Sequence, residues 1–493
     1  MNSMNYANLF SITLPETILE IVSLLVLAID LGLLRKSTQA ARMTAACILG
    51  VLGCVAAIGW LFLYPQPLGI LGDALVATPL VAAAQIGILL LTALVLLLSV
   101  KAEFSRNPGE FVAIVLLATT GMMLVAAARD LQVIFIALEL LSLSLYVLTA
   151  FAKSSAQSAE AALKYYLFGG MSAAMMLFGF SYLYGITGTT SLAGIAESLA
   201  SQPASPLLIV ALVLVAAGLG FKVAAVPFHL WAPDTYQGAP APVTALIASG
   251  SKVASFAVLV ALTDGFLSLS PSLQAPSWIV LLLCMAVGSI VLGNLAALVQ
   301  TSVRRLLAYS AIAHAGYMLL GIAAHTMQSG SAVLYYALTY ALTTVGAFGV
   351  IAIVERSTES DRLDAFAGLS RRSPLLAGTM LLFLLSLAGI PPLVGFWAKF
   401  NLFAAVLREP GAGSWGLALV ALALGTSAVS LYYYLQVLKR IYIADLPAEA
   451  GPIRTPVVSQ IVICLTAFSV VLLGCAPNIL LAWLRQAIQV VSR

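Results

Sequence analysis

Long apolar runs recur along the whole chain, and they constrain its fold more than any other feature of the sequence. A helix of about 20 apolar residues crosses a hydrocarbon core of roughly 30 Å. Fourteen such runs cover approximately residues 14–34, 43–64, 75–100, 111–128, 131–151, 161–184, 207–231, 243–262, 278–299, 306–324, 333–354, 375–407, 417–438 and 457–484. Hydrophobic residues make up 62% of the 493 residues and charged residues only 9%, whereas soluble domains contain about 25% charged residues. A water-soluble globular fold is therefore excluded.

The apolar runs are typical of helices and not of barrel strands. Each run is apolar around most of its circumference, and ten-residue segments of alternating polarity are missing from the sequence. The sequence therefore predicts an all-α polytopic membrane protein with about 14 transmembrane helices. We expect residues 1–493 to form a single membrane domain.

The basic residues indicate how this domain is oriented. Sixteen of the 23 Lys and Arg residues fall at the connections after odd-numbered segments, and four fall on the opposite side: Arg129, Arg408, Arg485 and Arg493. Because cytoplasmic connections are enriched in Lys and Arg, the sixteen are expected in the cytoplasm and both termini outside. The formal net charge of +4 is scattered, so no nucleic-acid surface is expected.

Three lysines belong to no connection, because Lys222, Lys252 and Lys399 fall within the seventh, eighth and twelfth segments. Glu139 lies nine residues after Asp130, which places it about 13 Å into the membrane at 1.5 Å per residue. An intramembrane charge costs several kcal/mol and usually faces a partner or a wet cavity. One such residue alone could form a structural ion pair, but the set of four favours a proton or ion path.

Prolines interrupt two of these segments. Pro227 follows Lys222 by five residues, and Pro391 and Pro392 precede Lys399; each proline removes a donor and frees a carbonyl group. The seventh and twelfth segments are five apart, and a repeat with an odd number of crossings must be inverted. We therefore predict inverted repeats of helices four to eight (residues 110–264) and nine to thirteen (residues 275–443), with broken helices seven and twelve. Residues 1–109 hold helices one to three, and residues 456–493 hold helix fourteen and the C-terminus.

Four further side chains are candidates for the same path. His229 lies two residues after Pro227, where an imidazole could carry protons, and His314 lies in the middle of the tenth segment. Each could instead be a hydrogen-bonded packing residue. Lys164 and Glu160 begin the sixth helix four residues apart and could form merely an interfacial ion pair.

The five cysteines, Cys47, Cys54, Cys284, Cys464 and Cys475, form no CxxC pair. We expect them to be small buried residues in apolar helices. No haem or iron–sulfur motif is present in the sequence, so no redox cofactor is expected in this chain.

Three long motifs resemble a known family. They are KVAAVPFHLWAPDTYQGAPAPVTA (222–245), GNLAALVQTSVRRLLAYSAIAHAGYMLLG (293–321) and LAGIPPLVGFWAKF (387–400). These stretches are similar to the antiporter-like, proton-translocating subunits of respiratory complex I, the bacterial NADH:quinone oxidoreductase. The stretches APDTYQGAPAPVT and ALELLSLSLYVL (137–148) are most similar to its N-type subunits. The resemblance covers nearly the whole chain.

The resemblance implies roles for particular residues and partners. It implies fourteen helices with inverted repeats, proton translocation by Glu139, Lys222, Lys252 and Lys399, and roles for Lys164 and His229. NADH, FMN, iron–sulfur clusters and quinone are expected in partner subunits and not in this chain. The implied partners are the membrane subunits M, K and J, indirectly L, A and H, the peripheral arm and membrane lipid. Position 304 is Arg where some relatives have Lys, which puts any proton transfer by Arg304 in doubt.

The hypothesis from sequence is one proton channel operated by an electrostatic switch. Opposite charges about 7 Å apart interact by roughly 2.4 kcal/mol at an effective dielectric of 20, so approach of Glu139 would favour protonated Lys222. Protons would enter from the cytoplasm past Lys164, His229 and Lys252 and leave through Lys399. Three alternatives stay open: an Mrp-type cation/proton antiporter subunit, the equivalent subunit of a plastoquinone- or ferredoxin-linked relative of complex I, and a purely structural scaffold.

Overall fold

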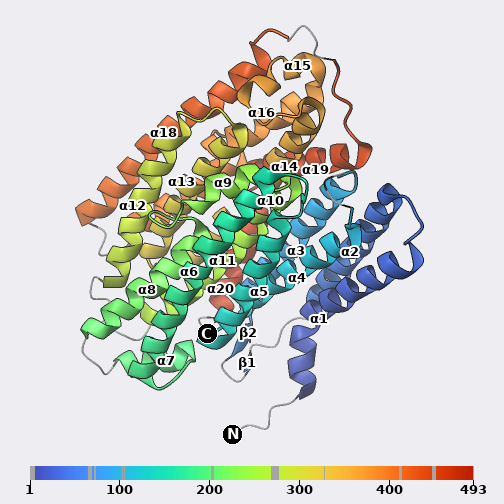
Figure 1. Ribbon diagram of the computed structural model, residues 1–493. Coiled ribbons are helices and arrows are strands. Elements are labelled where there is room, and N and C mark those ends of the chain that lie inside the picture. The colour runs from blue at the N-terminus through green and yellow to red at the C-terminus, as the bar shows by residue number, and fades with distance from the viewer. Residues whose placement is uncertain are drawn as a thin grey trace.

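The protein is a bundle of long helices packed side by side (Figure 1). The structure is a computed structural model, and it describes residues 6–64, 69–71, 74–102, 104, 106–200, 205–267, 277–326, 328–409, 413–446 and 451–491.

The helices follow the order of the apolar runs. The first half contains α1 (Tyr6–Ala28), the π-helical turn η1 (Ile29–Leu33), α2 (Gln39–Leu63), α3 (Pro79–Ser99), α4 (Pro108–Ala127), α5 (Leu131–Thr149), α6 (Ala156–Thr187), α7 (Leu192–Ala200), α8 (Pro206–Val223), α9 (Trp231–Gly238), α10 (Ala241–Ala248) and α11 (Gly250–Leu267). The second half contains α12 (Ser277–Ala297), α13 (Val303–Ala323), α14 (Ser329–Thr358), the short 3₁₀ helix η2 (Leu363–Phe366), α15 (Leu369–Arg372), α16 (Pro374–Ala388), α17 (Val394–Leu407), α18 (Gly413–Tyr442), α19 (Val457–Cys475) and α20 (Asn478–Val491).

Capping residues fix where several of these helices begin. Thr78 accepts a hydrogen bond from the backbone N–H of Val81, and Pro79 opens the first turn of α3. Asp130 caps α5 by accepting from the N–H of Gln132 at 2.8 Å. Such side chains satisfy backbone donors that have no partner inside the helix, and proline fits the first turn because its missing N–H is not needed there.

Thirteen helical stretches among the described residues are long and apolar enough to cross a membrane. The twelfth predicted segment instead forms two shorter apolar helices, α16 and α17. The thirteen long stretches and the pair α16–α17 thus correspond one for one to the fourteen apolar runs. The prediction of an all-helical polytopic fold is confirmed.

Three local details differ from the sequence prediction. Segment 243–262 is not one helix, because α10 ends at Ala248 and α11 begins at Gly250; between them the Ser249 hydroxyl donates to Ala245 O at 2.5 Å and competes with the helical pattern. Segment 457–484 divides at Pro477, which cannot continue the hydrogen bonding of α19. A short antiparallel hairpin, β1 (Gly69–Leu71) and β2 (Leu75–Ala77), with Ile70 opposite Val76, precedes α3.

The cysteine prediction is only partly right. Cys47 and Cys54 are buried, whereas Cys284, Cys464 and Cys475 are exposed on the outside of the bundle. A thiol on an apolar, outward-facing helix surface needs no burial in protein if that surface faces lipid.

Contacts between connections place them in two sets at opposite ends of the bundle. Leu75 bridges Ala128, and Asp130 bridges Ser191, which joins the connections after the second, fourth and sixth segments. Ser302 bridges Arg362, which joins the connections after the ninth and eleventh. In Figure 1 the β1–β2 hairpin and α7 lie toward the lower end of the view and α15 toward the upper end. Even and odd connections are thus separated, as alternate crossings require.

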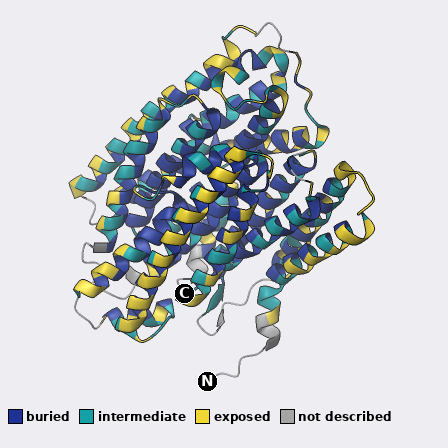
Figure 2. Cartoon of the chain, viewed as in Figure 1, coloured by how far each residue is buried: buried dark blue, intermediate teal, exposed yellow. Residues whose placement is uncertain are grey.

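Burial distinguishes central from peripheral helices (Figure 2). α13 and α14 are almost entirely enclosed, whereas α1, α2 and α18 expose much of their surface. The exposed side chains include large apolar groups such as Leu24, Phe62 and Phe468. Because lipid tails are as apolar as these residues, such a surface fits a bilayer. The three intramembrane lysines are accordingly buried inside the bundle and away from this apolar surface.

Close helix packing makes one glycine a test of the bundle. A Cβ on Gly293 of α12 would lie 2.6 Å from the N of Ala313 and 2.9 Å from the O of Tyr309, both backbone atoms of α13. We expect Gly293→Ala to destabilise the protein by about 1–3 kcal/mol, as overpacking does, and to lower its unfolding temperature in detergent. Gly425→Ala on the exposed α18 meets nothing within 4 Å and should melt like the wild type. Equal melting of the two variants would contradict the tight α12–α13 contact.

Candidate functional site

Glu139 and Lys222 face each other between α5 and α8. Lys222 Nζ lies 4.0 Å from Glu139 Oε1 and donates a hydrogen bond to the hydroxyl of Ser142, one turn after Glu139 on α5. The Lys222 residue is 8% exposed, and the Glu139 side chain is 26% exposed. Glu139 Oε1 makes no hydrogen bond to any residue that the structure describes. The pair is in loose electrostatic contact without direct hydrogen bonding.

The chain breaks immediately after Lys222, which lies in the last turn of α8. Ala224 adopts a left-handed conformation (φ 58°), and α9 begins only at Trp231. The indole N–H of Trp231 donates to Phe221 O at 2.9 Å, and the Val226 N–H donates to the Ser289 hydroxyl at 2.9 Å. Side chains thus satisfy backbone groups that the break frees. The negative end of the α8 dipole favours the positive charge of Lys222.

His229 lies in this break and is 7% exposed. Its Nδ1 has no hydrogen-bond partner among the described residues. In the described part of the chain, His229 thus has one ring nitrogen without a partner and no hydrogen bond to another of the predicted site residues.

Lys252 lies two residues into α11, just after the interruption at Ser249. Its Nζ donates to Ala311 O on α13 at 2.7 Å and lies 5.7 Å from the centre of the Tyr340 ring on α14. Lys252 is 2% exposed. Carbonyl oxygen and an aromatic face stabilise its charge without a carboxylate.

His314 lies one turn after Ala311, and a cavity begins beside it. Its Nδ1 is 2.8 Å from the Tyr336 hydroxyl, and its ring centre is 4.9 Å from that of Tyr340. The cavity is small, with room for about one water molecule between α13, α14, α16 and α17, and His314, Ser386 and Ala398 line it. It lies beside the break between α16 and α17, so a predicted histidine and a helix interruption share one space.

Lys399 of α17 reaches across that break to the end of α16. Its Nζ donates to Ala388 O at 2.9 Å and to the Ser427 hydroxyl at 2.6 Å, and it lies 5.5 Å from the centre of the Tyr317 ring. Ala388 is the last residue of α16, and Gly389 then takes φ 89° against the lysine side chain. The carbonyl group freed by the break thus binds the buried ammonium group.

Aromatic side chains lie between His314 and Lys399. The rings of His314 and Tyr317 are 5.8 Å apart. Asn294 donates to the Tyr317 hydroxyl at 3.1 Å and accepts from Tyr433 at 3.1 Å. Tyr434 lies 3.4 Å from His314 Nε2. Tyrosine hydroxyl groups, two of them held by the Asn294 amide, therefore extend from His314 toward Lys399.

Lys164 lies in a different cluster near one end of the bundle. Its Nζ forms ion pairs with Glu160 at 2.7 Å and with Asp234 of α9 at 2.8 Å. Arg305 of α13 contacts the other oxygen of Asp234 at 2.5 Å. The Lys164 side chain is 40% exposed. The predicted ion pair with Glu160 exists, and it extends to a third helix.

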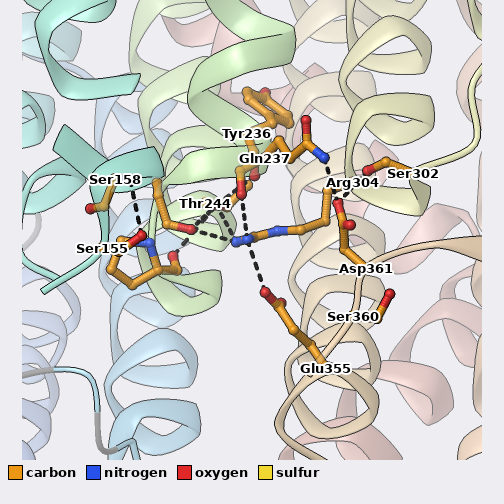
Figure 3. A network of polar contacts seen from close by, with 12 residues as sticks. Ser155, Ser158, Tyr236, Gln237, Thr244, Ser302, Arg304, Glu355, Ser360 and Asp361 are labelled. Carbon is orange, nitrogen blue, oxygen red and sulfur yellow. Dashed lines mark hydrogen bonds and ion pairs between the residues drawn. The ribbon is translucent and has the colours of Figure 1, made fainter. Parts of the chain in front are cut away.

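Arg304, the neighbour of Arg305, forms the most extensive polar network (Figure 3). It donates to Gln237 O at 2.7 Å and Ala239 O at 2.6 Å at the end of α9, to Thr244 of α10 at 3.0 Å, and to Glu355 of α14 at 3.3 Å. Arg304 is 3% exposed. One buried guanidinium group thus holds α9, α10, α13 and α14 together, which is a positioning role.

The structure separates the predicted residues into three groups. Glu139 and Lys222 form one group. Lys252, His314 and Lys399 form a second, in which His314 lines the cavity and the two lysines lie beside the rings of Tyr340 and Tyr317. Lys164 and Glu160 belong to the third, with Asp234. Sequence reasoning missed Ser142 and Ser427, the hydroxyl groups bound to two of the lysines. Ser142 lies three residues after Glu139, and this spacing could have indicated that its hydroxyl group is near the same site. No local sequence feature indicates Ser427, which lies on α18.

The central part of the chain matches a family model. Residues 128–427 match the family described as NADH:quinone oxidoreductase/Mrp antiporter, transmembrane. These residues include the helices that carry Glu139, Lys222, Lys252, His314 and Lys399.

Relatives and solved structures extend the match over the whole length. The chain is 51% identical to NADH-quinone oxidoreductase subunit N 2 of Acidobacterium capsulatum over 98% of this chain and 100% of that protein. It resembles a chain of respiratory complex I from Thermus thermophilus with a TM-score of 0.77 and 34% identity, covering 95% of this chain and 98% of the other.

A chain of the Mrp complex from Dietzia sp. has the same fold, with a TM-score of 0.80, 20% identity and coverage of 97% and 98%. The resemblance to N-type subunits predicted from the sequence motifs is confirmed by the identity to subunit N. The chain therefore belongs to the family of transmembrane subunits shared by NADH:quinone oxidoreductases and Mrp antiporters.

Proposed function

We propose that this chain is the N-type subunit of a proton-pumping NADH:quinone oxidoreductase and that it provides one proton channel. The observation that carries the proposal is the set of three buried lysines, each bound to neutral oxygen atoms at or beside a helix interruption. A buried ammonium group with neutral partners can give up its proton more easily than one fixed in a tight salt bridge. The sequence identity to subunit N and the structural similarity to a chain of complex I support the same function.

Glu139 and Lys222 act as the electrostatic switch in this proposal. At 4.0 Å, opposite charges interact by about 4 kcal/mol at an effective dielectric of 20. Withdrawal of Glu139 would remove that stabilisation and favour loss of the proton from Lys222. The absence of a direct hydrogen bond between the two side chains suits a pair that must separate.

The proton route then continues through the second group. Lys252 receives the proton, His314 and the surrounding tyrosine hydroxyl groups pass it along the cavity, and Lys399 delivers it to the outside. Lys164, Glu160 and His229 lie on the cytoplasmic entry side of this route. A water molecule in the small cavity beside His314, with further water entering as the helices move, would complete the connections between side chains that do not touch.

The driving force comes from other subunits. NADH, FMN, iron–sulfur clusters and quinone react in partner subunits, and this chain works as part of the translocase without a redox centre of its own. The proposed neighbours are subunits M, K and J, with L, A, H and the peripheral arm acting indirectly. The whole assembly lies in the bacterial inner membrane.

We further propose that both termini lie on the periplasmic side and that the two lysine groups belong to inverted repeats, residues 110–264 and 275–443. The connections that contact one another after even-numbered and after odd-numbered segments form two separate sets, which supports helices that cross the membrane in alternating directions. The excess of Lys and Arg in the odd-numbered set supports its placement in the cytoplasm. The breaks after α8 and after α16 support the repeat, since each falls in the fourth span of its unit.

The test is proton pumping by the complete complex in vesicles, with NADH oxidation measured in parallel. Glu139→Gln and Lys222→Met should each lower the proton flux through this subunit by at least about tenfold, as loss of a proton-transfer group does, and so decrease the number of protons pumped per NADH by the share that this channel carries. The double variant should be no worse than either single variant, because the two residues act as one pair. Intact pumping with both changes would exclude the switch. A second measurement on the same vesicles, the decay of an imposed Na⁺ gradient without NADH, distinguishes an Mrp-type antiporter. Such an antiporter would dissipate the gradient.

A further inference from the structure

A buried carboxyl group lies outside the proposed proton route, on α1. Glu16 is 5% exposed, although it lies on one of the most peripheral helices. Its Oε1 accepts a hydrogen bond from Gln85 Nε2 of α3 at 2.8 Å. Its Oε2 is buried and has no hydrogen-bond partner among the residues that the structure describes.

Among the residues that the structure describes, none offers Glu16 a compensating positive charge. Gln85 is itself held by Met123 O of α4 at 3.4 Å, so the amide group is a fixed neutral donor. The charged group that acts on Glu16 is Glu20, one turn further along α1, which has the same sign. A buried carboxylate without a counter-charge is costly, so some positive charge must accompany it or it must be neutral.

Empty space lies directly beside this carboxyl group. A small pocket, with room for about one water-sized group and partly open to the outside, is lined by Glu16, Gln85, Thr13 and Thr78 and by the strand Leu75–Ala77. The lining combines a carboxylate, an amide and threonine side chains. The pocket lies at the end of the bundle that carries the β1–β2 hairpin (Figure 1). It therefore offers oxygen ligands and an opening toward an aqueous face.

We propose that the pocket at Glu16 binds one small monovalent cation, a proton or Na⁺, taken from the aqueous phase at the hairpin end. The unpartnered Oε2 provides the negative charge, and the neighbouring polar groups provide neutral ligands. Carboxylate and neutral oxygen groups suit hard cations. This site is separate from Lys222, Lys252 and Lys399 and does not depend on the proposed function.

The complete, membrane-embedded complex allows a direct test with dicyclohexylcarbodiimide, which modifies protonated carboxyl groups in apolar surroundings. Peptide mass spectrometry would measure modification of Glu16 between pH 5 and pH 9 in sodium-free buffer. We expect Glu16 to be modified at pH 7 at least about tenfold more than Glu359, which is exposed in the connection directly after α14. If NaCl decreases the modification of Glu16 and choline chloride does not, the bound cation is Na⁺. If NaCl leaves the modification unchanged, the bound cation is the proton.

Two variants check that the signal comes from this pocket. Glu16→Gln should abolish the modified peptide. Gln85→Leu removes a donor that favours the ionised carboxylate, so the midpoint pH of modification should rise by about one unit. No modification of Glu16 at pH 7 in sodium-free buffer would overturn the proposal, and so would an unchanged midpoint in Gln85→Leu.

Discussion

Lys399→Met should abolish proton delivery through this subunit. Methionine has a similar length but can neither carry the proton nor donate to Ala388 O and Ser427, the two partners of Lys399 Nζ. We expect proton release attributable to this channel to fall by at least about 100-fold, the usual contribution of a positioned proton-transfer group. The measurement is the ratio of protons released to NADH oxidised by the complete complex in vesicles, followed with a pH-sensitive dye.

Lys399→Arg is the matched control, because it separates charge from proton transfer. Arginine keeps the positive charge at the end of α16 but does not release its proton. If Lys399 transfers protons, Lys399→Arg should assemble normally and still fail to pump. A purely structural lysine predicts the opposite, since Lys399→Arg would restore pumping. A normal ratio in Lys399→Met would contradict the proposed exit.

Arg304→Met should destabilise the protein more than any other single change considered. It removes the donor for Gln237 O, Ala239 O, Thr244 and Glu355 and leaves a charge and three polar groups without their partner. Breaking a buried charged network of this kind costs roughly 3–5 kcal/mol. The expected result is a large decrease in unfolding temperature in detergent and a poor yield of assembled complex.

Arg305→Met provides the comparison at the adjacent position. Arg305 pairs with Asp234, and both side chains are 29% exposed, so this loss should cost no more than about 1 kcal/mol. Arg304→Lys should be intermediate, because an ammonium group cannot reach all four acceptors in the planar geometry of a guanidinium group. If Arg304→Met unfolds at the same temperature as Arg305→Met, the network of Figure 3 does not stabilise the fold.

The sequence predicts the crossings well because each crossing is a local property. A run of about 20 apolar residues must be a helix in lipid, whatever its neighbours are. Pro477 and Ser249 show where this reasoning reached its limit. Ser249 interrupts a helix through one hydroxyl group that bonds to Ala245 O, and serine does so in only some helices. The apolar pattern alone could not indicate that break.

The site was predictable as a set of residues but not as an arrangement. Lys222, Lys252, Lys399 and Glu139 stand out because a charge in an apolar run is rare. Which of them lie together depends on helix packing, which no single run encodes. Thus His314 shares a cavity with the α16–α17 break, whereas His229, although only seven residues from Lys222, lies in the break after α8. The part of His229 in the proton route stays a prediction.

The two helix breaks suggest why lysines at corresponding places of the two proposed repeats need not align in sequence. Lys222 precedes its break and belongs to α8, whereas Lys399 follows its break and reaches back to the last carbonyl of α16. What the two positions share is a positive charge near the C-terminal end of a half-helix. A lysine could therefore move from one half-helix to the other during divergence while its charge kept a similar electrostatic environment. Searches for internal duplication should compare where the charged atoms lie and not only which residue numbers carry them.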